Sequence, residues 1–273
     1  RFTILKDIAA AGNQVPVPYD DTRQETILRY YDRYKEVALY VHFPWCIEHC
    51  SYCHYYRGPI LKRSLLESML EAEKKHALRL DEWIDLPNRK VRSIYFGGGT
   101  PTVIAAELLE DALGYYFNRY RGGEDCEVCL ECSIITLKPK KVEILERYIN
   151  RLSVGVQSFD DRVLKIMERK HTGAEAEEVL KDIVPRFASV NVDLIYGLYD
   201  QTMEMWLDSV EKSIRLGVPS LTLYRLDIRE IESIMEIFRN APGRFPDELQ
   251  CWRMYEEARE MLELNQVKAS AAY

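Results

Sequence analysis

The 273-residue sequence has no apolar run that approaches the roughly 20 residues needed to cross a bilayer. Its first residues also lack the basic segment followed by an apolar core that marks a secretory signal. Positive charge is in deficit, because 37 Lys and Arg stand against 44 Asp and Glu, for a net charge of -7. Nucleic acids and anionic membranes normally bind basic surfaces, so we expect neither as a partner. The sequence predicts a cytoplasmic protein with a small-molecule substrate.

The whole chain contains seven cysteines. An odd number, with three close together, does not fit a disulfide framework and is typical of metal ligation in a reducing compartment. Hydrophobic residues make up 47% of the chain, which is ordinary for a globular core.

The stretch 40–58, YVHFPWCIEHCSYCHYYRG, contains Cys46, Cys50 and Cys53 in CxxxCxxC spacing. Three thiolates in so short a loop can hold three irons of a cubane cluster, which leaves the fourth iron without a protein ligand. A small molecule with an amino group and a carboxylate could bind that open iron. The sequence therefore predicts a metal centre with a place for such a molecule.

Other interpretations of the cysteines stay open. The loop could hold reduced thiols, or a zinc ion completed by His42, His49 or His54, although zinc sites usually combine two CxxC pairs or one CxxC with two histidines. A second string, Cys126, Cys129 and Cys132, lies on a predicted strand, where alternation sends Cys129 to the face opposite the other two. We interpret that string, and Cys251, as small buried thiols.

Short β-rich runs alternate with helical segments from residue 37 to residue 226. The expected strands are 37–43, 91–96, 127–135, 152–156, 190–195 and 220–226, and the clearest helical segments between them are 61–83 and 105–120. This alternation implies parallel pairing with right-handed crossovers. The sequence predicts an α/β fold, a partial (β/α)6 barrel related to the closed TIM barrel, with its site at the carboxyl ends of the strands.

Two flanking regions complete the expected organisation. Residues 1–36 are interpreted as an N-terminal leader with a helix at 22–34, and residues 37–228 as the barrel. Residues 229–273 are interpreted as a helical C-terminal region, with helices at 230–238 and 247–264, that forms part of an incomplete substrate domain. We expect the final residues, LNQVKASAAY, to be neither a capped helix nor a strand with a partner.

Polar residues and glycines recur where the predicted strands end. Gly97, Gly98 and Gly99 with Thr100 follow the second strand, where glycines let the backbone approach a ligand; a tight strand-to-helix turn is the alternative. Glu131 ends the third strand and could pair with a ribose diol, unless it is a surface carboxylate.

Three further candidates come from the later units. Gln157 ends the fourth strand and can both donate and accept hydrogen bonds. Arg169 could return to the site as the partner of a carboxylate, or be an ordinary charge at a helix C-terminus. Asp193 lies within an apolar strand, where an isolated carboxylate is costly unless it is hydrogen-bonded.

The chain contains the motifs YVHFPWCxxxCxYC, YFGGGTPT, RLSVGVQSF, RKH, DLIYGL followed by QT, and LTLYRLD. Through these motifs, over most of residues 37–226, the chain resembles the radical S-adenosylmethionine (SAM) family of oxygen-independent coproporphyrinogen III oxidase. That family includes haem chaperones and class C methyltransferases and cyclopropanases. The resemblance implies a [4Fe-4S] cluster on Cys46, Cys50 and Cys53 whose unique iron binds SAM.

The resemblance also implies roles for residues around the cluster. Contacts to the first SAM would come from Tyr40, Gly98 and Glu131. Residues matching those that place a second SAM in some members are Tyr52, Gly99, Thr100, Gln157, Arg169 and Asp193. We expect Tyr55, His42 and Arg225 to be the catalytic residues, although a core histidine is at least as good an interpretation of His42.

One departure from the oxidase motif directs the functional hypothesis. The oxidase carries a fourth cysteine two residues after the third, where this chain has Tyr55. We therefore expect a radical SAM enzyme that transfers a one-carbon unit from a second SAM to an sp2 carbon of a small molecule, by methylation or cyclopropanation. A flavodoxin or ferredoxin would supply the electron. The alternatives are a haem chaperone of the same family and, less favoured, the oxidase itself.

Overall fold

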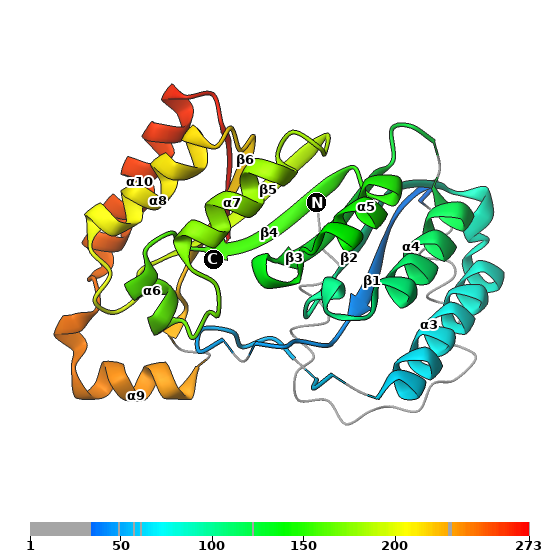
Figure 1. Ribbon diagram of the computed structural model, residues 1–273, viewed down its shortest axis with the longest axis horizontal. Coiled ribbons are helices and arrows are strands. Elements are labelled where there is room, and N and C mark those ends of the chain that lie inside the picture. The colour runs from blue at the N-terminus through cyan, green and yellow to red at the C-terminus, as the bar shows by residue number, and fades with distance from the viewer. Residues whose placement is uncertain are drawn as a thin grey trace.

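The computed structural model describes residues 34–48, 50–56, 58–60, 62–121, 123–228 and 231–272. Within these ranges seven parallel strands form one sheet in chain order, each paired with the next along the chain (Figure 1). The strands are β1 (Glu36–Phe43), β2 (Lys90–Gly98), β3 (Glu127–Ser133), β4 (Arg151–Gln157), β5 (Ser189–Tyr196), β6 (Ser220–Arg225) and β7 (Lys268–Ala272). An open, curved sheet of this kind has all its carboxyl ends along one edge.

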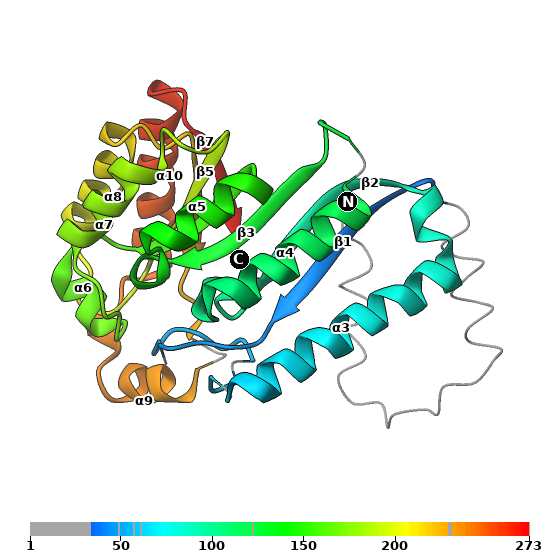
Figure 2. The same ribbon diagram turned by 45° about the vertical axis from the view of Figure 1, so that its right-hand side comes forward.

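Helices connect successive strands and lie along the outer face of the curved sheet in both views (Figures 1 and 2). They are α3 (Arg63–Ile84), α4 (Ala106–Tyr120), α5 (Pro139–Tyr148), α6 (Asp161–Ile166), α7 (Gly173–Ile183), α8 (Met203–Arg215), α9 (Glu232–Asn240) and α10 (Glu248–Leu264). Short 3-10 turns occupy Leu86–Asn88, Pro101–Val103, Ile134–Thr136 and Pro242–Arg244. No described helix is long and apolar enough to span a membrane.

The two faces of the sheet differ in chemistry because strand residues alternate between them. Apolar side chains such as Phe96, Leu130 and Val154 are completely buried in the core between sheet and helices. The opposite, inner face carries polar residues, including Glu131, which pairs in register with Ser153 of β4. The polar inner face leaves room for chemistry that the apolar outer face does not.

The predicted fold class is confirmed, with differences at the end of the chain. The six expected strands form, mostly within two residues of their predicted ends, but 134–136 is a 3-10 turn, in which Thr136 hydrogen-bonds back to Ser133. The expectation that the last residues form no paired strand is wrong, because β7 pairs with β6 from Lys268 to Ala272. The predicted helix at 22–34 lies outside the described residues, except for Tyr34, and the division into leader, barrel and substrate domain stays a prediction.

Candidate active site

The cysteine loop begins at the carboxyl end of β1 and is closed by backbone hydrogen bonds. The Gly58 N–H donates to the Pro44 carbonyl at 2.6 Å, and the Cys46 N–H donates to the Gly58 carbonyl at 3.3 Å. Between these two ends the Cys53 N–H donates to the Cys50 carbonyl at 3.2 Å. The loop is therefore folded back on itself at the edge of the sheet where the strands end.

A second set of contacts fixes the loop against the fourth βα unit. Ser51 donates from its N–H to the Met167 carbonyl at 3.3 Å and from its hydroxyl to the Ile166 carbonyl at 3.0 Å. Figure 1 shows the loop running along this edge toward α6. Tyr52 is half-buried, and burial raises the pKa of its phenol, which lies close to Arg169 and Cys50.

The three predicted cluster ligands lie on this loop and form no disulfide; Cys50 is buried, and Cys46 and Cys53 are half-buried. No three His, Cys, Asp or Glu side chains of the described residues converge on one point where a single metal ion would bind. A cubane cluster needs no such convergence, because each cysteine binds a different iron. Three soft thiol donors on one loop fit an iron–sulfur cluster. His49, a possible zinc ligand, lies outside the described residues.

The glycine-rich turn after β2 packs directly on the start of the cysteine loop. The Gly99 N–H donates to the Phe43 carbonyl at 2.6 Å, and the Thr100 N–H donates to the Trp45 carbonyl at 2.8 Å. A Cβ at Gly99 would lie 2.5 Å from the Trp45 carbonyl oxygen, so no larger residue fits. The Thr100 hydroxyl lies 3.7 Å from the Cys46 thiol. The glycines are needed for this close approach of two backbones, whether or not they also contact a ligand.

Glu131 joins β3 to the same turn. One of its carboxylate oxygens accepts a hydrogen bond from the Tyr95 hydroxyl at 2.6 Å, and the other accepts from the Gly98 N–H at 3.0 Å. Burial raises the pKa of this carboxyl, and the two hydrogen bonds oppose that rise. Glu131 is therefore a half-buried carboxylate with two hydrogen-bond partners at the predicted SAM position, and the surface interpretation does not apply.

Tyrosines cover the exposed part of the inner face. Tyr40 on β1 hydrogen-bonds His42 at 3.0 Å, and partial burial with nearby Glu131 and Tyr55 raises the pKa of Tyr40 to about 12. Tyr55, predicted to be near the substrate, is 66% exposed, and burial of its hydroxyl followed by the charge of Cys53 raises its pKa. Tyr224 of β6 completes the group: burial first, and then the nearby Asp193, Glu131 and Tyr55, raise the pKa of its phenol.

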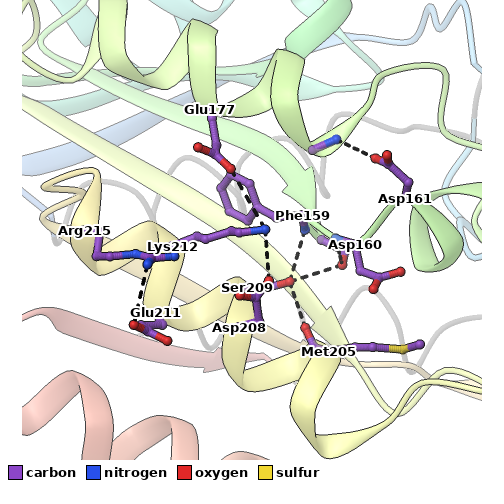
Figure 3. A network of polar contacts seen from close by, with 12 residues as sticks. Phe159, Asp160, Asp161, Glu177, Met205, Asp208, Ser209, Glu211, Lys212 and Arg215 are labelled. Carbon is purple, nitrogen blue, oxygen red and sulfur yellow. Dashed lines mark hydrogen bonds and ion pairs between the residues drawn. The ribbon is translucent and has the colours of Figure 1, made fainter.

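Gln157 ends β4 in a left-handed conformation, with φ of 71°. The turn that follows it is anchored to α8, where the Phe159 N–H donates to the Ser209 hydroxyl at 3.1 Å. Figure 3 shows this contact, together with the hydrogen bond from the Ser209 hydroxyl to the Met205 carbonyl. The helix behind the strand therefore holds the buried Gln157 at the end of the sheet.

Asp193 lies on the inner face of β5 among polar neighbours. It accepts hydrogen bonds from Asn191 at 2.8 Å and from the Ser153 hydroxyl at 3.3 Å. Burial first, and the Glu131 carboxylate second, raise its pKa to about 7, although these hydrogen bonds oppose the shift. The predicted requirement that this carboxylate be hydrogen-bonded is met.

Arg169 reaches the cysteine loop from the α6–α7 connection, so it is not a charge exposed at a helix end. Its Nη1 lies 3.4 Å from the Cys50 thiol and 3.1 Å from a Glu48 carboxylate oxygen, and its Nη2 donates to the Gly155 carbonyl at 2.7 Å. Glu48 was not predicted as a site residue. Its only signal in the sequence is its position between Cys46 and Cys50.

Arg225 is the predicted site residue that the structure does not bring to this group. Its guanidinium forms an ion pair with Glu248 at the start of α10, at 2.6 Å. Strand alternation sends it to the face opposite Tyr224, which the predictions missed. The role expected for Arg225 near the substrate gains no support from its position.

A protein-family model described as the Radical SAM superfamily matches residues 40–213, which span β1 to α8 and include the cysteine loop and the strand ends described above. The chain belongs to the radical SAM superfamily. Membership implies a [4Fe-4S] cluster and SAM as cofactors. The three cysteines and their loop fit that cluster.

Known relatives narrow the comparison. The chain is 30% identical, over 83% of its length and 59% of the relative, to "Heme chaperone HemW" of Haemophilus influenzae. It is 31% identical, over 82% of its length and 51% of the relative, to "Radical S-adenosyl methionine domain-containing protein 1, mitochondrial" of Mus musculus. The chain thus spans between half and three fifths of these curated relatives.

A solved structure supports the fold. The coproporphyrinogen III oxidase (HemN) of Escherichia coli, described as a radical SAM enzyme, matches with a TM-score of 0.77 and 22% identity, over 95% of this chain and 61% of that one. At this identity the likeness shows the fold alone.

These relatives correct the functional hypothesis drawn from the sequence. The expected transfer of a one-carbon unit from a second SAM is wrong, because relatives that are 29–30% identical to this chain are named haem chaperones. The position of Tyr55, which argued against the oxidase, did not distinguish a chaperone from a methyltransferase. Whether a second SAM binds stays a prediction.

Proposed function

We propose that the chain binds haem, or a closely related flat tetrapyrrole, at the inner face of its radical SAM barrel and acts as a haem chaperone. The observation that carries the proposal is the group of exposed tyrosines beside the cysteine loop, Tyr40, Tyr55 and Tyr224, which are 58%, 66% and 36% exposed. The haem chaperones among the relatives support the choice of ligand.

The physical argument concerns shape and surface. Aromatic side chains that stay exposed beside polar groups are suited to binding a flat aromatic ligand. Tyr55 contributes to the raised pKa of both the Tyr40 and the Tyr224 phenols. Their rings belong to β1, the cysteine loop and β6, so a flat ligand resting on them would bridge the opening of the partial barrel.

The radical SAM centre has its own part in the proposal. When bound, the cluster supplies the electron that cleaves SAM, and Cys46, Cys50 and Cys53 would hold it. Glu131 fixes the glycine turn through Gly98, which shapes the SAM side of the site. The electron would come from a donor such as flavodoxin or ferredoxin.

The test is an anaerobic titration of the cluster-reconstituted chain with haem, followed by its Soret band and by gel filtration. The proposal expects about one haem per chain, recovered intact and transferable to an apo-haem protein. A Soret change no larger than that of haem added to buffer alone would overturn it. Haem that is consumed with 5'-deoxyadenosine formation would also overturn the chaperone role and point to an enzyme acting on haem.

A further inference from the structure

Glu48 is a buried carboxylate placed between the first two cluster cysteines. Its side chain is only 6% exposed, and so is that of Arg169, with which it forms an ion pair at 3.1 Å. An ionised carboxylate in such a place is costly unless it is paired and hydrogen-bonded. The proposed haem site does not involve Glu48.

The contacts of Glu48 connect the cysteine loop to two other βα units. One carboxylate oxygen accepts a hydrogen bond from the Lys170 N–H at 2.8 Å, in the α6–α7 connection. The other accepts from the hydroxyl of Ser133 at 3.1 Å, at the end of β3. The carboxylate therefore ties the segment between Cys46 and Cys50 to the rigid edge of the sheet.

Arg169 carries the same arrangement on to a cluster ligand. Its Nη1, which faces Glu48, also lies 3.4 Å from the Cys50 thiol. Its Nη2 is held by the Gly155 carbonyl at 2.7 Å and by the Ser133 hydroxyl at 3.2 Å. The guanidinium is thus fixed between a carboxylate and a thiol, and the negative charge of Glu48 offsets its positive charge at Cys50.

We propose that Glu48 and Arg169 are a positioning pair for the cluster: they hold the cysteine loop in its ligating arrangement and set the reduction potential through the net charge beside Cys50. A nearby positive charge favours the more negative, reduced state of a cluster. Removing the Glu48 charge leaves the guanidinium unbalanced and raises the potential, whereas removing the Arg169 charge lowers it. The proposal depends on ligation by Cys46, Cys50 and Cys53 and is independent of haem binding.

Four variants separate the two effects. Glu48→Gln keeps hydrogen-bonding atoms but loses the charge, Glu48→Ala loses both, and Arg169→Gln removes the opposite charge. The matched control is Glu67→Gln, which breaks an exposed pair with Arg63 on α3. The readouts are hydrogen exchange of residues 46–53 in the cluster-free chain, and a potentiometric titration of the reconstituted chain followed by electron paramagnetic resonance.

Opposite shifts of the midpoint potential, upward for Glu48→Gln and downward for Arg169→Gln, are expected, with none for Glu67→Gln. Hydrogen exchange of 46–53 in Glu48→Ala is expected to be about tenfold faster or more, because breaking a buried ion pair is strongly destabilising. Shifts of the same sign in the two charge variants, or none, would overturn the electrostatic role. Unchanged exchange in Glu48→Ala would overturn the positioning role. If Glu48→Ala does not fold, Glu48→Gln still decides the first question.

Discussion

The His42 ring, at the end of β1, fills the space that a side chain on Gly98, at the end of β2, would need. A Cβ on Gly98 would lie 2.5 Å from the His42 ring, and Gly98 itself has a φ of 112°, a conformation that residues with side chains rarely adopt. His42 in turn hydrogen-bonds the Tyr40 hydroxyl. The glycine therefore determines where His42, and through it Tyr40, can stand on the inner face.

Gly98→Ala is expected to displace His42 and to raise the Kd for SAM, whereas a glycine substitution away from the site should lower only the free energy of unfolding. Gly217→Ala is the matched control, since Gly217 has a φ of 73° but nothing within 4 Å of the added Cβ. Each variant should lose about 1 kcal/mol or more of unfolding free energy from backbone strain. Isothermal titration with SAM and urea unfolding separate the effects. Equal SAM affinity in the two variants would contradict the steric argument.

The strand pattern was predictable because β-branched and apolar runs alternate with helical periodicity at every unit. The exception, β7, has the sequence KASAA, which has little intrinsic preference for a strand and becomes one by pairing with β6. Local sequence carries no signal for such an element, since its stability comes from a neighbour about 50 residues earlier in the chain.

The candidate site was predictable where motif and strand end coincide, as at Gly98 and Glu131. It was not predictable where tertiary contacts decide, because Glu48 differs from an ordinary loop acid only through its buried partner Arg169. Alternation along β6 carried a signal that was not used: Thr222 pairs in register with Asp193, which places Tyr224, two residues on, on the inner face and Arg225 on the outer.

The chain is expected to bind iron through one cysteine string only. Replacing Cys46, Cys50 or Cys53 with Ala should reduce iron and sulfide from about four of each per chain to a small fraction. Cys129→Ala is the control, because that thiol contacts Arg151 on the inner face of β3 and burial raises its pKa to about 12, which disfavours the thiolate that metals need. Iron loss in Cys129→Ala equal to that in Cys50→Ala would count against this assignment.

Asp193 gives the fold a dependence on pH. The pKa of its carboxyl is raised by burial from 3.8 to about 7, so between these values the unfolded chain releases a proton that the folded chain keeps. Stability should therefore fall as pH rises through this window, by at most about 1.4 kcal/mol per pH unit from this group, and change no further above it.

Urea unfolding at several pH values tests this in Asp193→Asn, whose stability should decline less steeply than that of the wild type between about pH 4 and pH 7. Asp208→Asn, which alters an exposed ion pair with Lys212 on α8, should keep the wild-type slope. An unchanged slope in Asp193→Asn would show that the native carboxyl titrates as it does in the unfolded chain.

Tyr55 connects the cluster loop to the proposed haem surface, since it follows Cys53 by two residues and its ring is 66% exposed. If the ring stacks on a tetrapyrrole, Tyr55→Ala should lose about 0.5–1.5 kcal/mol of binding free energy, which raises the Kd for haem roughly two- to tenfold. Tyr55→Phe keeps the ring and should bind as the wild type does. Trp252→Ala removes an aromatic ring that is 61% exposed on α10 and should leave the Kd unchanged. Soret titrations of the four proteins measure these constants, and equal losses in the Tyr55→Ala and Trp252→Ala variants would mean that haem binds exposed aromatic residues without selection.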